Sequence, residues 1–541
     1  MISTKEKDGP FDVIIVSGDA YVDHPSFGTA VIARVLESKG YSVGIIAQPD
    51  WRSKTDFMKL GKPGLYFGIT AGNMDSMVAN YTPLKKPREY DAYTRDGIIG
   101  KRPDMATIVY CNRLRECFKD VPLVIGGIEA SLRRLAHYDY WKNSVRKSLL
   151  FDAKADVLVY GMGEHAVVEL AKFYEDHTKK DTPLGIMNTC VKLKTAPEGH
   201  IVIPSFGEVE HDKKKFCEAF VLYSKNQKIA QQHTDWFLVQ YPMHVMDEKE
   251  IDAVYDLPYS RKEGYHEKIP AFMTTRFSVV THRGCFGNCS FCALALHQGK
   301  IIQSRSERSI IEEIQKITKL EGYRGTIDDM GGPSADMYGM DCSTPCGNDC
   351  ISCEKRKKDR AKLISLLTVA KKVPDVRNVF VSSGIRYDLA MESPEYIRKI
   401  VRDHVPGRIK VAPEHVSGKV LSLMKKPTID CYEKFLSFVS EIDTTTEILP
   451  YFMAAHPGCD IREMRELMAF VEKHGEAEQC QLFTPTPMTR STCMYWTGMV
   501  PETGEEIYVP YTYHEKKLQK AMMVPSQNED RLKELDFDTG M

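Results

Sequence analysis

Short β-branched runs alternate with helical patterns through residues 10 to about 175, and no other feature limits the fold of this chain so strongly. Strands are predicted at residues 13–17 and 42–47, with a helix over 28–39 between them. Strands that alternate with helices at this spacing form βαβ units with parallel strands. The pattern therefore predicts an α/β domain built on a Rossmann-like, doubly wound parallel sheet. Its other predicted elements are strands at 65–69, 123–125 and 157–160 and a helix near 105–118.

A second α/β series begins at Phe277. Its predicted strands cover residues 277–280, 325–330, 378–382, 408–412, 447–454 and 481–484. Six strands with helices between them predict a partial (β/α)6 barrel, whose active site lies at the carboxyl ends of the strands. We expect an N-terminal domain, a connector with a hairpin near 200–204 and a helix near 208–225, a barrel, and a C-terminal extension with a polar tail. These parts span residues 1–175, 176–270, 271–500 with a cysteine-rich insertion at 341–354, and 501–541.

The composition describes a globular protein with a large core. Of 541 residues, 43% are hydrophobic and 27% charged, and the formal net charge is −1. This charge gives no strong signal for nucleic acid or a membrane as partner, and the basic stretch 132–147 fits either a nucleic-acid contact or a solvated helix face. The sequence has no apolar signal region and no run of about eighteen apolar residues, so we expect a cytoplasmic protein. Fifteen cysteines without a secretion signal predict metal sites rather than disulfides.

The sequence THRGCFGNCSFC at residues 281–292 carries most of the functional information. Cys285, Cys289 and Cys292 have the C-x3-C-x2-C spacing, which supplies three thiolates to a cubane [4Fe–4S] cluster and leaves the fourth iron without a protein ligand. The motif resembles that of radical SAM enzymes, in which this iron chelates S-adenosylmethionine (SAM) and electron transfer cleaves SAM to a 5′-deoxyadenosyl radical. Zinc or simple packing is the alternative, but structural zinc prefers four ligands and the motif offers no obvious fourth.

Glycine-rich and polar turns follow the predicted barrel strands. Gly331, Gly332 and Pro333 come after the second strand, and glycines let the backbone approach a ligand closely. By resemblance to radical SAM barrels, this turn binds the methionyl amino group of SAM, and Phe291, directly before the third cysteine, packs near the adenine. The common turn ends in Glu-Pro, whereas here Pro333 follows the glycines directly, which leaves open the group that replaces the glutamate.

A second cysteine group lies in the insertion, in the sequence DCSTPCGNDCISCEK. Four thiols within twelve residues, separated by turn-forming Pro, Gly and Asn, can enclose one tetrahedral metal or one cubane cluster. We favour an auxiliary Fe–S cluster, with structural zinc as the alternative and unligated thiols as a third option, because spacing does not separate metals that both prefer thiolates. The four residues are Cys342, Cys346, Cys350 and Cys353.

The loop after the first strand contains Asp23, His24 and Gly28. Cobalamin domains use a D-x-H-x-x-G loop at the same topological place, with the histidine bound to cobalt. Here Asp and His are adjacent and the glycine is four residues beyond the histidine, so the spacing does not match. We expect His24 to cap the loop or to line a pocket at the point where the strand order reverses. Cobalamin stays an unfavoured cofactor, kept because many radical SAM methyltransferases bind it without this histidine.

Several long motifs together identify the chain as a member of the YgiQ family of radical SAM proteins, and the resemblance covers almost the whole chain. It implies a SAM-radical barrel with a family-specific N-terminal domain and supplies no substrate. The motifs are GDAYVDHPSFG (18–28), IIAQPDW (45–51), GGIEASLRR (126–134), the cysteine loop and FTPTPMTRSTCMYWTG (483–498).

Residues 411–428 and 483–485 are also similar to strands of methylthiotransferase-type radical SAM barrels that hold SAM. This resemblance makes Arg386, Glu414 and Ser417 candidate SAM contacts, together with Ser382 at the end of the third strand. The alternative for Glu414 and Arg386 is an ordinary salt bridge at a strand end.

The leading hypothesis is an enzyme that reductively cleaves SAM at a [4Fe–4S] cluster and abstracts a hydrogen atom from an unidentified substrate, with electrons from a donor such as flavodoxin or ferredoxin. Sulfur insertion is favoured by the barrel similarity and the second cysteine group. Methylthiotransferases, however, place three cluster cysteines in the N-terminal region, where this chain has only scattered ones. Methyl transfer requires cobalamin. A non-catalytic zinc or Fe–S scaffold is the alternative from a different class.

Overall fold

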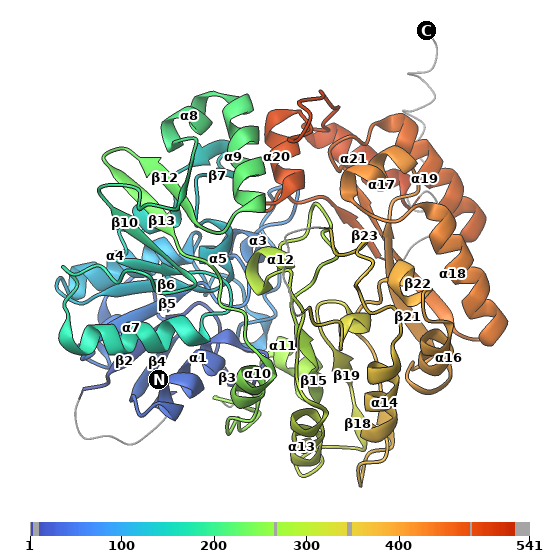
Figure 1. Cartoon of the computed structure of the whole chain (residues 1–541), viewed down its shortest axis with the longest axis horizontal. Coiled ribbons are helices and arrows are strands. Elements are labelled where there is room, and N and C mark those ends of the chain that lie inside the picture. The colour runs from blue at the N-terminus through green and yellow to red at the C-terminus, as the bar shows by residue number, and fades with distance from the viewer. Residues whose placement is uncertain (1, 4–9, 265–267, 343–348, 476–478, 525–541) are drawn as a thin grey trace. The chain divides into compact units, whose positions relative to one another are not determined.

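The computed structural model describes residues 2–3, 10–264, 268–342, 349–475 and 479–524. The chain divides into two compact units (Figure 1). Unit 1 comprises Met1–Arg276 and Leu296–Gly299, and unit 2 comprises Phe277–Ala295 and Lys300–Met541. The cysteine loop belongs to unit 2, and the short segment Leu296–Gly299 that follows it belongs to unit 1.

Unit 1 contains a ten-stranded sheet in the order β1-β4-β2-β5-β6-β9-β10-β13-β12-β11. The five strands from β4 to β9 are parallel, which confirms the doubly wound arrangement. β2 is buried along its whole length, as expected of a strand covered by helices on both faces. The strands are β1 (Ile2–Ser3), β2 (Val13–Ser17), β4 (Val43–Ala47), β5 (Tyr66–Thr70), β6 (Leu123–Gly126), β9 (Val157–Val159), β10 (Thr189–Leu193), β11 (Ile201–Ile203), β12 (Ile229–His233) and β13 (Trp236–Gln240).

The strand order reverses at β2, with β4 on one side and β5 on the other. The loops after β2 and β5 therefore face each other at the switch point, where open α/β sheets bind ligands. Right-handed crossovers in opposite directions place helices on opposite faces. Helices α1 (Gly28–Ser38) and α7 (Glu164–Asp176) contact each other, as do α2 (Thr55–Met58) and α4 (Ala106–Cys117). The remaining helices before the connector are α3 (Ser76–Asn80), α5 (Gly127–Leu132) and α6 (Leu149–Asp152).

Residues 176–270, expected as a connector, extend the sheet of unit 1. β10 pairs antiparallel with β9 and β13. The hairpin is formed by β12 and β13, whereas β11, near the expected hairpin at 200–204, pairs in parallel with β12. The expected helix 208–225 is divided into α8 (Phe206–His211) and α9 (Lys213–Lys225), because the Asp212 side chain accepts two backbone N–H groups and begins a new helix. α10 (Glu248–Tyr255) and α11 (Pro270–Thr275) follow in the chain.

Unit 2 contains parallel strands with helices between them, in agreement with the predicted partial barrel. β15 pairs with β19, β18 with β20, and β21 with β22 and β23, and a parallel bridge joins Ile385 to Val411. The strands are β15 (Ser278–Val280), β18 (Thr326–Ile327), β19 (Asp329–Gly331), β20 (Asn378–Val379), β21 (Arg408–Glu414), β22 (Glu447–Ala454) and β23 (Gln479–Leu482).

Several helices of unit 2 bury an apolar face in its core. Ile310, Ile314 and Ile317 of α13 and Leu363 and Leu367 of α14 lie in one hydrophobic core, as their spacing predicts. The helices are α13 (Glu307–Ile317), α14 (Ala361–Ala370), α15 (Tyr387–Ala390), α16 (Pro394–Asp403), α17 (Gly418–Met424), α18 (Ile429–Ile442), α19 (Ile461–His474), α20 (Arg490–Thr497) and α21 (Tyr513–Met522), and the residues of α12 (Leu294–Gln298) are divided between the two units.

Two further expectations concern surfaces. The basic stretch 132–147 begins with buried residues: Arg133 is fully buried and pairs with Asp75 and Asp139, so this part is neither a solvated face nor a nucleic-acid contact. Within the described part of the chain, no helix combines the length and the apolar character needed to cross a bilayer.

Candidate functional site

The three cysteines of the predicted cluster motif lie in the loop between β16 (His282–Arg283) and α12. Gly284 has φ +85°, and a Cβ there would come within 2.0 Å of the Ile301 carbonyl oxygen, so the loop entrance requires glycine. The Gly287 N–H donates to Cys285 Sγ over 3.4 Å. Burial raises the pKa of Cys292 to about 12, with a further rise from Cys289.

These thiols fit an iron–sulfur cluster by their chemistry. They are free and partly buried. Gly287 contacts the Sγ atoms of both Cys285 and Cys289, and the Cys292 N–H donates to the Cys289 carbonyl over 3.1 Å, so the three residues lie in one tight loop. Among the described residues, no three His, Cys, Asp or Glu side chains converge at ligand distance. Because burial disfavours lone thiolates, a cationic cluster that draws the sulfurs together would compensate their charge.

Ser290, a residue of the cysteine loop that the sequence did not single out, anchors the loop to two other elements. Its Oγ donates to the Leu423 carbonyl over 2.8 Å and lies 2.9 Å from Ser491 Oγ. Ser491 is in turn 2.7 Å from Nε2 of the buried His456, which follows β22. The motif at 483–498 therefore holds the cysteine loop in place.

Glu414 ends β21 with its carboxylate buried. Its φ of +71° coincides with a register shift in the pairing of β21 with β22. Among the described residues, its Oε2 has no hydrogen-bond partner. Burial raises the pKa of Glu414 to about 7, against the opposing charge of Lys426, and the Glu414 charge raises the pKa of Cys292. One oxygen of this buried carboxylate thus has no partner, and its charge acts on Cys292 of the cysteine loop, which favours a ligand contact over the salt-bridge alternative.

Arg386 contacts the cysteine loop itself. Its Nη1 donates to the Gly287 carbonyl over 3.0 Å and lies 3.4 Å from Cys289 Sγ. The same guanidinium pairs with Asp388 at 3.0 Å. Arg386 therefore has a contact with a predicted cluster ligand that its place at a strand end did not indicate.

The glycine turn at the end of β19 packs closely against the entrance of the cysteine loop. The Gly331 carbonyl accepts from Thr281 N–H over 2.8 Å, and a Cβ at Gly332 would come within 2.5 Å of the His282 ring. After Pro333, the sequence continues to Asp336, which is fully buried and accepts from Arg386 N–H over 3.2 Å. Its Oδ2 has no partner in the described chain, and burial raises its pKa. Asp336, a carboxylate three residues after the turn, was missed in the sequence.

The remaining predicted SAM contacts have more ordinary surroundings. The Ser382 hydroxyl donates to the Asp328 carbonyl over 2.7 Å. Ser417 precedes α17, and its N–H donates to His415 Nδ1 over 3.0 Å. The Phe291 ring lies edge-on to His456, with centroids 6.4 Å apart.

The second cysteine group is described in part. Cys342, Cys350 and Cys353 lie within the described residues and Cys346 lies outside them. Cys350 and Cys285 pack against the same small apolar cluster, so the insertion approaches the first cysteine loop. This cluster consists of Phe286, Ile302, Met337, Met340 and Leu389.

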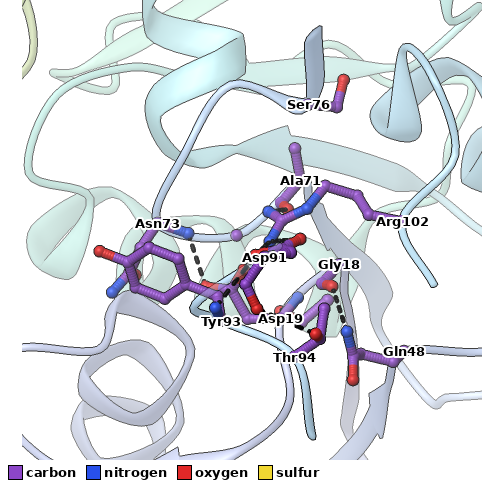
Figure 2. A network of polar contacts seen from close by, with 12 residues as sticks. Gly18, Asp19, Gln48, Ala71, Asn73, Ser76, Asp91, Tyr93, Thr94 and Arg102 are labelled. Carbon is purple, nitrogen blue, oxygen red and sulfur yellow. Dashed lines mark hydrogen bonds and ion pairs between the residues drawn. The ribbon is translucent and has the colours of Figure 1, made fainter. Parts of the chain in front are cut away.

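The switch point of unit 1 is filled by a buried polar network (Figure 2). Arg102 has a fully buried side chain, with Nη2 2.8 Å from Asp19 and 3.1 Å from Asp91. Its Nη1 donates to the Ala71 carbonyl over 2.5 Å. The Asn73 N–H donates to Asp19 over 2.7 Å. Burial raises the pKa of Asp19 to about 6, against the lowering effect of Arg102.

This crevice does not fit cobalamin. A Cβ at Gly18 would come within 2.3 Å of the Ala71 oxygen, and one at Gly72 within 2.0 Å of Asp19, so the loops after β2 and β5 are in contact. His24 is fully buried; its Nδ1 accepts from Ser26 N–H over 3.0 Å, and its Nε2 lies 2.8 Å from Arg261. The imidazole caps its own loop, as expected, and is not presented to a metal.

Comparison with known families agrees with the two-unit division. The family described as "Radical SAM N-terminal" matches residues 3–278, and the "Radical SAM superfamily" matches residues 279–471. A UPF0313 protein of Methanocella arvoryzae is 48% identical and covers 95% of this chain and 90% of its own. The UPF0313 protein MJ1155 of Methanocaldococcus jannaschii is 46% identical and covers 97% and 91%.

Two solved structures share the fold at low identity. The radical SAM methyltransferase TsrM of Kitasatospora setae, with tryptophan and a SAM analogue bound, has a TM-score of 0.51 at 15% identity and covers 89% of this chain and 76% of its own. The cobalamin-dependent SAM radical enzyme OxsB, with aqua-cobalamin bound, has a TM-score of 0.50 at 12% identity and covers 97% and 62%. At these identities the likeness concerns the fold alone.

Proposed function

We infer the function of this chain from its family: it belongs to the UPF0313 family, which is the YgiQ family, and is a radical SAM enzyme with a [4Fe–4S] cluster and SAM as cofactors. We propose that Cys285, Cys289 and Cys292 hold that cluster. We also propose that the enzyme abstracts a hydrogen atom from its substrate. When bound, the cluster supplies the electron that cleaves SAM to methionine and a 5′-deoxyadenosyl radical. A reductant of the flavodoxin or ferredoxin class delivers the electron.

The observation that carries this proposal is the position of Glu414 beside the cysteine loop. A buried carboxylate oxygen without a partner destabilises the fold by about 1–3 kcal/mol. The unpartnered Oε2 of Glu414 therefore indicates a ligand that donates a hydrogen bond to it. The ammonium and hydroxyl groups of SAM are such donors. We assign Glu414 the leading role in binding SAM, supported by Gly331, Gly332 and Pro333 at the turn that packs against the entrance of the cysteine loop.

Phe291, Ser382 and Ser417 are proposed as secondary contacts, since each borders a strand end or the cysteine loop. Arg386 stays a candidate SAM contact, but its contact with Cys289 Sγ favours an interaction with the cluster instead of with SAM. Asp336 is a further carboxylate near the glycine turn that can replace the glutamate of the common motif.

Sulfur insertion with an auxiliary metal is the second candidate function. It is favoured by the shared packing of Cys350 and Cys285, which brings part of the insertion toward the SAM-binding loop. We propose that Cys342, Cys346, Cys350 and Cys353 bind a second Fe–S cluster or zinc. Cobalamin-dependent methyl transfer is not favoured, because the switch point of unit 1 is closed by the chain's own side chains.

Glu414→Gln tests the SAM site. The amide keeps the shape and removes the charge, and hydrogen bonds to charged groups contribute about 1.5–3 kcal/mol, so we expect the Kd for SAM to rise about tenfold to a hundredfold. Equilibrium dialysis with labelled SAM measures the Kd, and iron content shows that the cluster is retained. Glu447→Gln is the matched control, because Glu447 forms an exposed pair with Arg408 at the other end of β21. Equal Kd values for Glu414→Gln and wild type would contradict the assignment.

A further inference from the structure

Arg386 joins the cysteine loop to Asp388 through one buried guanidinium. Nη1 reaches the Gly287 carbonyl at 3.0 Å and Cys289 Sγ at 3.4 Å, while Nε and Nη2 donate to Asp388 Oδ2 over 3.1 and 3.0 Å. The side chain is 9% exposed. We infer that Arg386 is a positioning residue that stabilises the reduced form of the cluster and so sets its reduction potential, an inference that rests on the proposed cluster ligands.

The contact is fixed from both ends of the side chain. The Arg386 backbone N–H donates to the buried Asp336 Oδ1, and Arg386 is the N-cap residue of α15. A Cβ on Gly287 would come within 2.8 Å of Nη1, so glycine at this position permits the guanidinium to approach the loop. A planar fork with five donors can satisfy a carbonyl, a sulfur and a carboxylate together, which a lysine ammonium cannot reproduce with the same geometry.

The direction of the effect follows from charge. Reduction adds one electron, supplied by the reductant, to a cluster already bound by three thiolates, and no proton or leaving group is involved. A cation beside a ligand sulfur stabilises this added negative charge, and hydrogen bonds to sulfur and net charge are established determinants of cluster potential. The negative charge of Asp388, which pairs with the same guanidinium, lies further from the sulfur and partly offsets the stabilisation of the reduced cluster. Removing Arg386 must therefore lower the potential, and removing the charge of Asp388 must raise it.

Opposite shifts in Arg386→Gln and Asp388→Asn form the test. Each protein is reconstituted anaerobically without SAM, and the reduced cluster signal is followed by EPR during a redox titration. We expect Arg386→Gln to shift the reduction equilibrium about tenfold toward the oxidised form, about 59 mV for a one-electron couple. Asp388→Asn should shift it the other way, and Arg386→Lys should lie between Arg386→Gln and wild type. Arg408→Gln, at an exposed pair in the same unit, should leave the potential unchanged.

The outcomes separate this inference from the proposed function. Wild-type potentials in both Arg386→Gln and Asp388→Asn would overturn it, as would a loss of SAM affinity in Arg386→Gln at unchanged potential, which would place Arg386 on SAM. If Arg386→Gln does not retain iron, Asp388→Asn and Arg386→Lys decide, since both keep a cation at the loop. Wild-type protein without a cluster would remove the proposed function itself, and this inference with it.

Discussion

Arg102→Met should destabilise unit 1 strongly, because it leaves two carboxylates buried without their cation. Asp19 and Asp91 lie 2.8 and 3.1 Å from the guanidinium, each with a side chain only 6% exposed. Breaking a buried ion pair by removing one partner costs about 3–5 kcal/mol. At about 2–4 °C per kcal/mol for a domain of this size, the melting temperature of unit 1 should fall by about 6–20 °C.

The destabilisation caused by Arg102→Met should depend on pH through the buried Asp19. The folded-state pKa of Asp19 is already raised from 3.8 to about 6, and the lowering effect of Arg102 is lost in the variant, so its pKa must rise further. In wild type, the stability linked to this raised pKa is fully present below about pH 4 and is lost as the pH rises through about 6. Protonation of Asp19 should therefore reduce the destabilisation of the variant. The loss of unfolding free energy relative to wild type should be smaller at pH 5 than at pH 8.

Thermal unfolding of full-length protein at pH 5 and pH 8 measures both quantities. The triple variant with Asp19→Asn and Asp91→Asn should regain part of the lost stability. Arg115→Met is the matched control: its pair with Asp156 is 22% exposed on both sides, and its loss should cost about 1 kcal/mol or less. A deficit below about 1 kcal/mol for Arg102→Met, or one independent of pH, would refute the reasoning.

Two further substitutions probe the cysteine loop. Gly284→Ala forces a side chain onto φ +85° and within 2.0 Å of the Ile301 oxygen; we expect about 1–3 kcal/mol of destabilisation and loss of bound iron, measured by urea unfolding and iron analysis. Ser290→Ala removes the contacts with Leu423 and Ser491; it should cost about 1 kcal/mol and speed iron loss to a chelator, and a wild-type rate of loss would contradict the anchoring role.

Strand positions were predictable where burial made the residues uniformly apolar. The fully buried β2 and the parallel strands beside it occupy the expected residues within one or two positions. The extension of the sheet by β10 to β13 was not predictable, because buried polar residues interrupt the apolar pattern of β12 and β13, among them Gln231, His233 and Gln240. The division at Asp212 depends on a capping side chain within a continuous helical pattern.

The site was predictable to the level of strand ends and no further. Topology places Glu414 and the cysteine loop at the carboxyl ends of parallel strands, so their proximity followed from the fold. The directions of the side chains did not follow from the fold. Arg386 contacts Cys289 and Asp388, and Ser290 contacts Ser491, which lies about 200 residues further along the sequence. Contacts of this kind arise only when distant segments pack together.

Metal analysis of anaerobically purified protein tests the proposed cluster most directly. Iron, sulfide, zinc and corrin are measured in wild type and in the Cys285→Ala, Cys289→Ala, Cys292→Ala triple variant, and 5′-deoxyadenosine is assayed after dithionite reduction with SAM. We predict the loss of about four irons and of all deoxyadenosine in the triple variant, with no corrin in either protein, and about four irons retained if the second cysteine group binds a cluster. Zinc without iron in wild type, and no deoxyadenosine, would contradict the assignment.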